Sequence, residues 1–518
     1  DAAERSPFDY SGAADYRVPE ILQVLEEPPP QESRLSMAQL DAIGDRIVGQ
    51  LRSFRVDGKC VSKSPGPVIT CYEISLAPGI PVSRAAERDR EIAMAAKVNS
   101  VRIEAPIPGK DTIGIEVPNP VRQIVYFRDI LNDAAWPPKN AALPVALGSG
   151  TVGQHVVFDL ARAPHLLIGG STGSGKSVCI NTILASLLAL QKPDDLRLIL
   201  VDPKVVELSL YSEIPHLLTP VITDPEKTVR MLEWLCKEMD DRYEILARGR
   251  VRELKSFNEK QLAGEYDGIL PPEENRKLER IVVVIDEFAD IMAQTGKEFE
   301  KYVARIAAKA RAVGIHLVLA TQRPDAKIIT GKIKSNLPSR IAFRTAQNND
   351  SRIILGCGGA EKLLGMGDML FMAGNSPDVV RVHGCFISDG DVEKILEAVT
   401  GQGAEVSRFE DFCNGQALMP GEEPPGAAGD DESGEGGDGP VDKLFAQIAR
   451  DLLASGGGSI SDIQRTYNVG FSRAGRIVDQ LVRRGVLGPQ NNSSKKRAVL
   501  VSEEQLEEIV ARLPRGGR

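Results

Sequence analysis

Eight consecutive residues have the types and spacing that cradle the phosphates of a nucleotide. They fit the pattern G-x-x-x-x-G-K-[ST]. Glycines let the chain wrap so that backbone N–H groups point at phosphate oxygens. In this pattern the lysine reaches the β- and γ-phosphates and the hydroxyl holds Mg²⁺, so the predicted cofactors are ATP and Mg²⁺. The predicted nucleotide-binding residues are Gly170, Ser171, Thr172, Gly173, Ser174, Gly175, Lys176, Ser177 and Val178.

The stretches beside this motif have the pattern that a phosphate loop needs. Leu166–Ile168 predicts a strand that ends at the glycines, and the apolar residues between Val178 and Leu187 recur at helical spacing. The alternative is a Gly–Ser loop with a chance lysine. The strand before the motif and the helix after it favour the phosphate loop, because the helix N-terminus adds a partial positive charge.

Two acids follow a second strand pattern. Ile281–Ile285 is typical of a buried parallel strand, and Asp286 and Glu287 come directly after it. Asp286 suits the surroundings of Mg²⁺, and Glu287 is placed to polarise an attacking water. The alternative is two ordinary carboxylates at a strand end. With a phosphate loop about 110 residues upstream, the pair indicates a nucleotide hydrolase rather than a binder.

A third strand pattern, His316–Ala320, leads into a polar and then a basic segment. Gln322 fits the polar sensor of the γ-phosphate that follows this strand in RecA-like motors. The segment after it falls where such motors face the nucleic acid, although a solvated basic loop is the alternative. The candidate channel residues are Lys327, Lys332 and Lys334.

Several other basic residues have more than one possible role. Lys204, in Asp202-Pro203-Lys204, follows a strand at the edge where open α/β folds bind ligands, so it could meet a phosphate or an acid of the same site. P-loop hydrolases often need an arginine against the phosphate charge, and in a ring a neighbouring subunit supplies it. The sequence does not choose among the candidates, each of which is also compatible with a structural ion pair. The candidate trans arginines are Arg323, Arg340 and Arg352.

The elements that must position these residues divide the chain into five parts. Residues 1–35 are expected to be a disordered tail or linker, and residues 36–140 a small α+β domain with no cluster of catalytic residue types, hence a scaffold for assembly. This domain should contain helices at 37–54 and 82–96 and strands at 68–74, 101–104 and 112–117. Residues 141–420 alternate strands with helices, which predicts a parallel sheet with strands at 166–168, 196–201, 281–285, 316–320 and 340–343.

The last two parts differ sharply in composition. Residues 421–440 are rich in Gly, Pro and acids and lack basic residues, which indicates a flexible linker. Residues 441–518 are expected to form three short helices, at 441–454, 459–467 and 471–484, followed by a hairpin whose strand is 498–501. That layout is typical of a winged-helix domain.

Composition narrows the classes of function. The 518 residues carry a net charge of -9, which argues against a basic surface throughout but not against a local basic patch. The seven cysteines are scattered without C-x-x-C, which favours a reduced interior over disulfides or a zinc site. Because no apolar run reaches ~18 residues and no signal peptide is visible, we expect a cytoplasmic fragment without direct membrane contact. A chain that starts at Asp1 rather than Met is expected to be a piece of a longer protein.

Seven stretches resemble the FtsK/SpoIIIE family of bacterial DNA translocases, between about residue 36 and the end of the last domain. The resemblance implies an α/β fold with a RecA-like P-loop NTPase core, a small N-terminal α+β domain and a C-terminal winged-helix domain. The stretches are GPVIT from Gly66, GGSTGSGKSVCIN from Gly169, VDPKVVELSLYSEIPHLLTPVITD from Val201, VVVIDEFADIM from Val282, ATQRP from Ala320, IKSNLPSRIAFR from Ile333 and GGAEKLLGMGDMLF from Gly358.

The resemblance also implies partners and a cellular place. Members of the family form homo-hexameric rings, single or as two stacked rings, around double-stranded DNA. They pump the DNA by ATP hydrolysis during chromosome segregation and cell division. A membrane anchor usually precedes the motor, so the full-length protein is expected at the inner membrane of the division septum, with the motor facing the cytoplasm. Family members also contact a site-specific recombinase through the last domain.

In this family the last domain reads DNA. Ile477, Val478 and Leu481 are expected to face the core, which leaves the other face of helix 471–484 for the major groove. Arg can read guanine and Asp can accept from cytosine there, and the resemblance implies a short, polar, G-rich target that orients loading. Ser472 stands where relatives often have Asn, which weakens the base assignment at that position. A winged helix that binds protein is the alternative. The candidate DNA-binding residues are Ser472, Arg473, Arg476 and Asp479 in the helix and Lys495, Lys496 and Arg497 in the wing.

Three functions from different classes follow. The first is an ATP-driven motor on duplex DNA, which Glu287 and Gln322 favour. The second is a DNA-binding regulator whose ATPase acts only as an assembly switch, which could lack a water-polarising acid. The third is a related ring that pumps protein or conjugative DNA, against which the recognition-type helix in the last domain argues.

Overall fold

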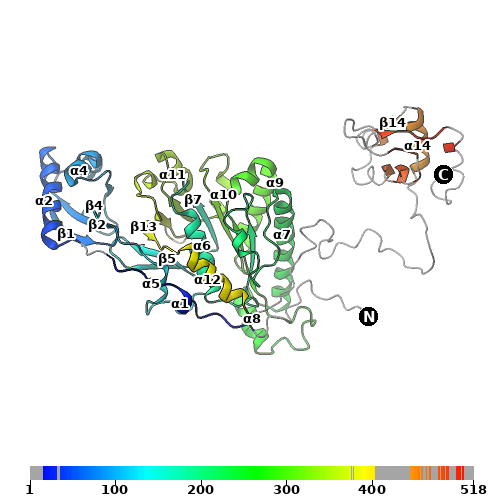
Figure 1. Cartoon of the computed structure of the whole chain (residues 1–518), viewed down its shortest axis with the longest axis horizontal. Helices are drawn as coiled ribbons and strands as arrows, with labels where there is room; N and C mark the ends of the chain where they lie inside the picture. The colour runs from blue at the N-terminus through cyan, green and yellow to red at the C-terminus, as the bar shows by residue number, and fades with distance from the viewer. Residues whose placement is uncertain are drawn as a thin grey trace. The chain divides into compact units, whose positions relative to one another are not determined.

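A nine-stranded mixed sheet carries the phosphate-binding motif at the carboxyl end of its strand β7 (Figure 1). This computed structural model describes residues 16–31, 35–402 except 375 and 377, and, further along, 444–454, 457–458, 463, 466–467, 477–478, 480–482, 484, 486–488, 497–502 and 505–506. The chain divides into two units, Asp1–Glu423 and Pro424–Arg518. The sheet lies in the first unit.

The strands of this sheet run in the order β6-β5-β13-β12-β11-β7-β10-β9-β8. The five from β11 to β8 are parallel and are those that the sequence predicts. The strands are β5 (Pro144–Gly150), β6 (His155–Asp159), β7 (His165–Gly169), β8 (Leu196–Val201), β9 (Arg280–Ile285), β10 (Ile315–Thr321), β11 (Ser339–Phe343), β12 (Asp368–Met372) and β13 (Val379–Gly384).

The expectation of a purely parallel sheet is wrong for the other four strands. β12, β13, β5 and β6 pair antiparallel. Parallel neighbours need a crossover of a dozen or more residues. The short link between β5 and β6 instead closes as a tight turn, in which the Gly150 N–H donates to the Gln154 carbonyl at 2.8 Å. A link this short permits only a hairpin.

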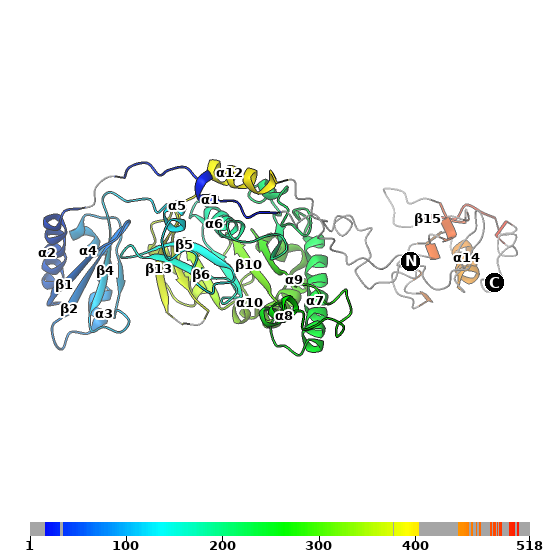
Figure 2. The same ribbon diagram turned by 90° about the horizontal axis from the view of Figure 1, so that it is seen from below.

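Helices cover both faces of the sheet (Figure 2). Alternate residues of each central strand enter opposite cores, as the two-residue repeat of a strand requires. In β9, Val282 and Val284 pack in the core that contains α6, while Val283 and Ile285 pack in the core that contains α7 to α9. The helices are α5 (Phe127–Leu131), α6 (Lys176–Leu188), α7 (Pro225–Arg248), α8 (Leu254–Leu262), α9 (Phe288–Lys309), α10 (Gly331–Asn336), α11 (Asn348–Leu355) and α12 (Asp389–Thr400), with 3-10 turns η1 (Ser209–Tyr211) and η2 (Ala360–Lys362).

A smaller antiparallel sheet of order β1-β2-β4-β3 forms the α+β domain that precedes the nine-stranded sheet in the chain. The predicted helix at 82–96 is two helices, and the Arg88 guanidinium at the break lies 5.0 Å from the centre of the Phe54 ring. The sequence analysis missed β1, whose residues GKCVSKSP show no clear apolar alternation. The elements are α2 (Met37–Ser53), β1 (Gly58–Pro65), β2 (Ile69–Leu76), α3 (Val82–Ala86), α4 (Asp89–Ala96), β3 (Arg102–Glu104) and β4 (Ile113–Pro118).

Residues 16–31 differ from the expected tail. They include the short helix α1 (Ile21–Val24), whose Ile21 packs with Leu25 in the core that also contains α12. The Arg128 guanidinium donates to the carbonyls of Leu22, at 2.7 Å, and of Leu25. The prolines and acids of this segment suggest a tail, but packing of the apolar Ile21 and Leu25 in a core outweighs them.

The second unit has a core of its own. α14 (Phe445–Ala454) contributes Phe445 and Ile448 to it. Ile477, Val478 and Leu481 are buried in the same core, which confirms the predicted inward face of that helix. The strands β14 (Gly457–Gly458) and β15 (Arg497–Ala498) pair antiparallel, and Leu487 pairs with Val499. The predicted acidic linker at 421–440 and much of the predicted winged helix lie outside the described residues.

Candidate nucleotide site

The phosphate loop connects β7 to α6 and is held from behind. The Ser171 N–H donates to the Arg344 carbonyl at 3.0 Å, and the Gly367 N–H donates to the Ser174 carbonyl at 2.9 Å. Gly175 begins the helix at φ 111°, a conformation that only glycine adopts without strain. The N–H groups of the first helical turn have no intrahelical acceptor, so they are available to phosphate oxygens.

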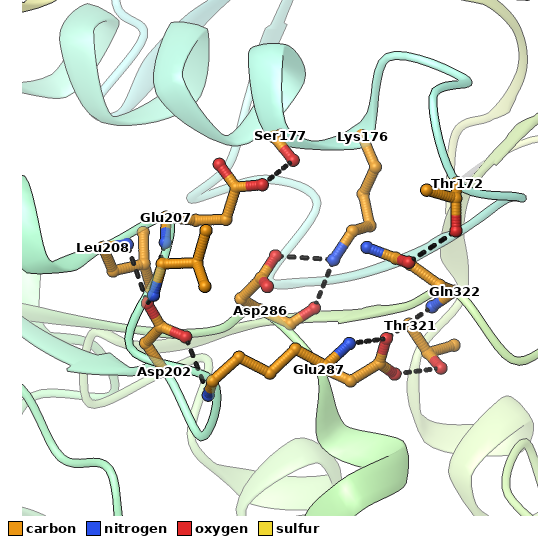
Figure 3. A network of polar contacts seen from close by, with 12 residues as sticks. Thr172, Lys176, Ser177, Asp202, Glu207, Leu208, Asp286, Glu287, Thr321 and Gln322 are labelled. Carbon is orange, nitrogen blue, oxygen red and sulfur yellow. Dashed lines mark hydrogen bonds and ion pairs between the residues drawn. The ribbon is translucent and has the colours of Figure 1, made fainter.

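Lys176 and Asp286 face each other across this loop (Figure 3). The Lys176 ammonium donates to the Asp286 carboxylate at 2.5 Å and to its carbonyl at 2.6 Å, and both side chains are almost fully buried. Burial raises the pKa of the Asp286 carboxyl above its usual value, and the neighbouring Lys176 offsets only part of this shift. The predicted lysine and the first predicted acid therefore share one site.

Glu287 is buried and held by three groups at the sheet edge. Its carboxylate accepts hydrogen bonds from the Thr321 hydroxyl at 2.6 Å and from the Gln322 N–H at 3.0 Å. The Lys204 ammonium lies 3.4 Å away. Lys204 therefore meets an acid of the site, which is one of the two roles that the sequence left open. Such a fixed carboxylate is suited to orient and deprotonate a water.

Gln322 joins β10 to the phosphate loop. Its side-chain oxygen accepts from the Thr172 hydroxyl at 2.9 Å (Figure 3). The same residue contacts Glu287 through its backbone. The predicted sensor thus links the loop that would hold phosphate to the acid that would activate water.

Two acids that the sequence analysis did not assign also reach this site. Glu207 accepts a hydrogen bond from the Ser177 hydroxyl at 2.6 Å. Asp202 is buried and binds the backbone of the loop that carries Glu207. In the sequence, Glu207 lies six residues after the end of a strand, and acids are common at such positions in exposed loops. The sequence therefore carries no signal for its role. Only the path of the loop in the structure brings Glu207 to the phosphate-binding motif.

The donor set fits Mg²⁺ held jointly with a nucleotide. Ser177 and Asp286 supply oxygen ligands or partners, which a hard cation prefers. Within the part of the chain that the structure describes, no group of three or more His, Cys, Asp or Glu side chains could hold a metal without such help. Mg²⁺ usually binds through one or two carboxylates plus substrate phosphates, so a sparse set is the expected one.

The three candidate trans arginines differ in their surroundings. Arg340 donates to the carbonyls of Leu337, Lys334 and Ile354, and burial lowers the pKa of its guanidinium. Arg323 is exposed, 3.5 Å from a carboxylate oxygen of Asp290. Arg352 is exposed on α11.

The candidate channel lysines follow Gln322, but not all of them in a loop. Lys327 is exposed in the loop before α10. Lys332 and Lys334 lie in α10, which begins after Thr330, whose side chain accepts from the Ile333 N–H. The Lys332 side chain is 76% exposed and Lys334 is half-buried.

Most of the predicted DNA-reading side chains lie outside the described residues. Arg497 is the first residue of β15, and nothing further is described of its side chain. The others named in the sequence analysis that fall there are Ser472, Arg473, Arg476, Asp479, Lys495 and Lys496.

Three family models match the chain. They are the FtsK alpha domain at residues 18–119, the FtsK/SpoIIIE family at residues 126–326 and the Ftsk gamma domain at residues 439–502. Together these matches extend from the N-terminal segment through the motor to the second unit.

Named relatives agree with the family models. DNA translocase FtsK of Haemophilus influenzae is 44% identical over 494 residues, which cover 92% of this chain and 90% of that protein. DNA translocase FtsK of Pasteurella multocida is 43% identical over 500 residues, which cover 92% of this chain but 52% of that protein. The chain therefore spans about half the length of several relatives.

Solved structures also resemble the chain, and TcpA is one of them. The pCW3 conjugation coupling protein TcpA, in its monomer form with ATPγS, aligns with a TM-score of 0.46 and 26% identity. The alignment covers 68% of this chain and 99% of TcpA.

Among the described residues, no helix is both long enough and apolar enough to cross a bilayer.

Proposed function

Because this chain belongs to the FtsK/SpoIIIE family and is an ATPase, we propose that it spends ATP hydrolysis on moving along double-stranded DNA. The observation that carries the proposal is the contact between Glu287 and the end of β10. The water-polarising acid is hydrogen-bonded to Thr321 and Gln322, and the chain runs from there directly into the basic segment at 327–334. Loss of the γ-phosphate on hydrolysis would thus alter the contacts of Glu287 and Gln322, and through them the position of a basic segment suited to bind DNA.

In this mechanism each group of the site has one task. Lys176 and the first turn of α6 bind the β- and γ-phosphates, and Gln322 senses the γ-phosphate from the opposite side. Glu287 takes the proton of the attacking water. Ser177 and Asp286 would hold Mg²⁺, which would supply positive charge against the phosphate oxygens.

The remaining charge calls for an arginine from a neighbouring subunit, and from the resemblance to the family we propose that the subunits form a homo-hexameric ring. Arg323 and Arg352 suit that role better than Arg340, because three carbonyls already bind the Arg340 guanidinium. Lys327, Lys332 and Lys334 are proposed to face DNA in the channel. We propose that two such rings can stack, and sedimentation of the assembled protein distinguishes a single ring from a stacked pair.

We propose that the second unit is a winged helix that reads short G-rich sequences and so orients loading. The match to the gamma-domain model at 439–502 supports this proposal, as does the burial of Ile477, Val478 and Leu481 in the core of the second unit. A site-specific recombinase is the proposed protein partner. The proposed setting is chromosome segregation at division, with the full-length protein anchored in the inner membrane and its motor in the cytoplasm.

ATP turnover with and without long duplex DNA tests the motor. We expect duplex DNA to stimulate turnover, and we expect the protein to displace a third strand from a triplex when ATP is present. Turnover that ignores DNA would favour the regulator with an assembly switch. Stimulation without triplex displacement would also contradict translocation.

A further inference from the structure

The loop after β8 places a third carboxylate beside the nucleotide motif. The Ser177 hydroxyl donates to Glu207 at 2.6 Å (Figure 3). Ser177 is the residue whose hydroxyl is expected to bind Mg²⁺. Glu207 therefore contacts the predicted metal ligand directly.

The loop that carries Glu207 is held rigidly. Asp202 is fully buried, and its carboxylate accepts hydrogen bonds from four backbone N–H groups. These groups belong to Lys204, Val206, Glu207 and Leu208, at 3.1, 2.9, 2.9 and 3.0 Å. Four bonds to one side chain define the path of the loop almost residue by residue.

Val205 shows that this path is imposed on the loop. Its φ is 56°, in the left-handed region that a β-branched residue rarely adopts. Its side chain is 60% exposed, so packing of that side chain does not compensate for the strain. Strain of this kind persists only where surrounding bonds over-determine the backbone. Here the hydrogen bonds to Asp202 fix the backbone of the loop, and this fixed path places Glu207 next to Ser177.

A serine that binds Mg²⁺ still needs an acceptor for its proton. The oxygen gives a lone pair to the metal and keeps its hydrogen, and the metal makes that hydrogen a stronger donor. A carboxylate is the strongest acceptor that a side chain offers. Partners behind metal ligands orient them, and their loss typically lowers metal affinity about 10–100-fold.

We propose that Glu207 is a positioning residue that orients the Ser177 hydroxyl toward the Mg²⁺ of the bound nucleotide. This inference rests on the proposed use of Mg–ATP. Glu207 touches neither the phosphates nor the water in this role. Glu207 acts through Ser177, so its loss should change the Mg²⁺ concentration that nucleotide binding requires.

Binding of a fluorescent ADP analogue tests the proposal on the whole chain. Affinity is measured in EDTA and then along a Mg²⁺ titration, for the wild type, Glu207→Ala and Glu207→Gln. We expect equal affinity in EDTA, and a Mg²⁺ midpoint about tenfold higher for Glu207→Ala. Glu207→Gln keeps an oxygen acceptor and should shift the midpoint less. The matched control is Glu213→Gln, an exposed glutamate further along the same connection, which should leave the midpoint unchanged.

A double variant distinguishes positioning from a general loss of structure. In a Ser177→Ala background, Glu207→Ala should change the Mg²⁺ midpoint no further, because its target is gone. An additive shift would overturn the proposal, as would an unchanged midpoint in the single variant or an equal loss of affinity in EDTA. A wild type whose binding ignores Mg²⁺ would contradict the proposed cofactor as well. If wild-type binding depends on Mg²⁺ but Glu207→Ala leaves the Mg²⁺ midpoint unchanged, only the role of Glu207 is contradicted.

Discussion

Lys176 has two roles at the scale of single residues. It is expected to bind phosphate, and it is also the buried partner of Asp286 at 2.5 Å. A buried acid left without its partner is strongly unfavourable. The residue thus contributes to folding as well as to chemistry, so its variants need a stability measurement beside any activity.

Lys176→Ala should abolish ATP hydrolysis because the β- and γ-phosphates lose their cation. The unfolding midpoint should also fall, since Asp286 remains buried and unpaired. Turnover and urea unfolding are the two measurements. Near-normal turnover in a folded variant would refute the phosphate assignment.

Glu287→Gln should bind ATP but hydrolyse it about 10²–10⁴-fold more slowly, because the amide cannot accept the proton of the attacking water. The amide oxygen can still accept from Thr321, so the fold should persist. Single-turnover rates and nucleotide affinity are the measurements. Glu298→Gln, an exposed position on α9, is the control. Equal losses of binding and turnover would argue against a water-activating role.

At the scale of elements, the phosphate loop depends on the link between η2 and β12. A Cβ at Gly175 would lie 2.5 Å from the Gly367 nitrogen, closer than real Cβ contacts. Gly175 also has φ 111°, which costs a residue with a side chain about 1–2 kcal/mol. Glycine is therefore required at position 175 for two reasons: the backbone has a positive φ, and the Gly367 backbone leaves no room for a Cβ.

Gly175→Ala should weaken nucleotide binding and lower the free energy of unfolding by about 1–3 kcal/mol. Gly296→Ala is the control, because a Cβ there meets nothing within 4 Å inside α9, and alanine favours helix. Nucleotide titration and urea unfolding measure both effects. If both variants bind nucleotide like the wild type, the close approach does not matter to the site.

Arg476→Ala tests the proposed recognition helix of the second unit. We expect a loss of about 1–3 kcal/mol in binding to a G-rich target, with little change for random duplex. Fluorescence anisotropy at one fixed salt concentration measures both affinities, since phosphate contacts are salt-dependent. Equal losses on both duplexes would make Arg476 a phosphate contact only.

At the scale of the first unit, one buried ion cluster connects the α+β domain to the motor. Arg381 of β13 binds Glu116 of β4 at 2.7 Å and Asp368 of β12 at 2.6 Å. The Arg102 guanidinium also contacts Glu116, at 2.9 Å. Charge from Arg381 holds the pKa of the Asp368 carboxyl well below its usual range despite burial.

Arg381→Ala should destabilise the first unit by about 3–5 kcal/mol, because two acids stay buried without their main partner. Cleavage in the connection at 119–126 should become faster as the α+β domain loosens. Arg305→Ala is the control, since its pair with Asp240 is half-exposed and such pairs contribute about 0–1 kcal/mol. Urea unfolding and limited proteolysis provide the readouts. Equal effects of the two variants would show that the buried cluster is not what joins the domains.

The sequence by itself determined the parts of this protein that depend on neighbours along the chain. The phosphate motif, the five parallel strands and the inward face of helix 471–484 follow from short patterns of apolar residues and glycines. Asp286, Glu287 and Gln322 could be named because each directly follows a strand of one sheet, and parallel strands end at one edge.

Only the tertiary structure decided which groups meet. Glu207 reaches Ser177 from 30 residues away, and Arg381 reaches Glu116 from 265 residues away. No local pattern encodes these contacts, because they depend on how a loop closes and how two sheets dock. The strands β5, β6, β12 and β13 and the packing of Ile21 and Leu25 were missed for a related reason. β13 pairs with β5 from far along the sequence, and Ile21 packs in the core that contains α12, so burial against distant partners, rather than local propensity, places these segments.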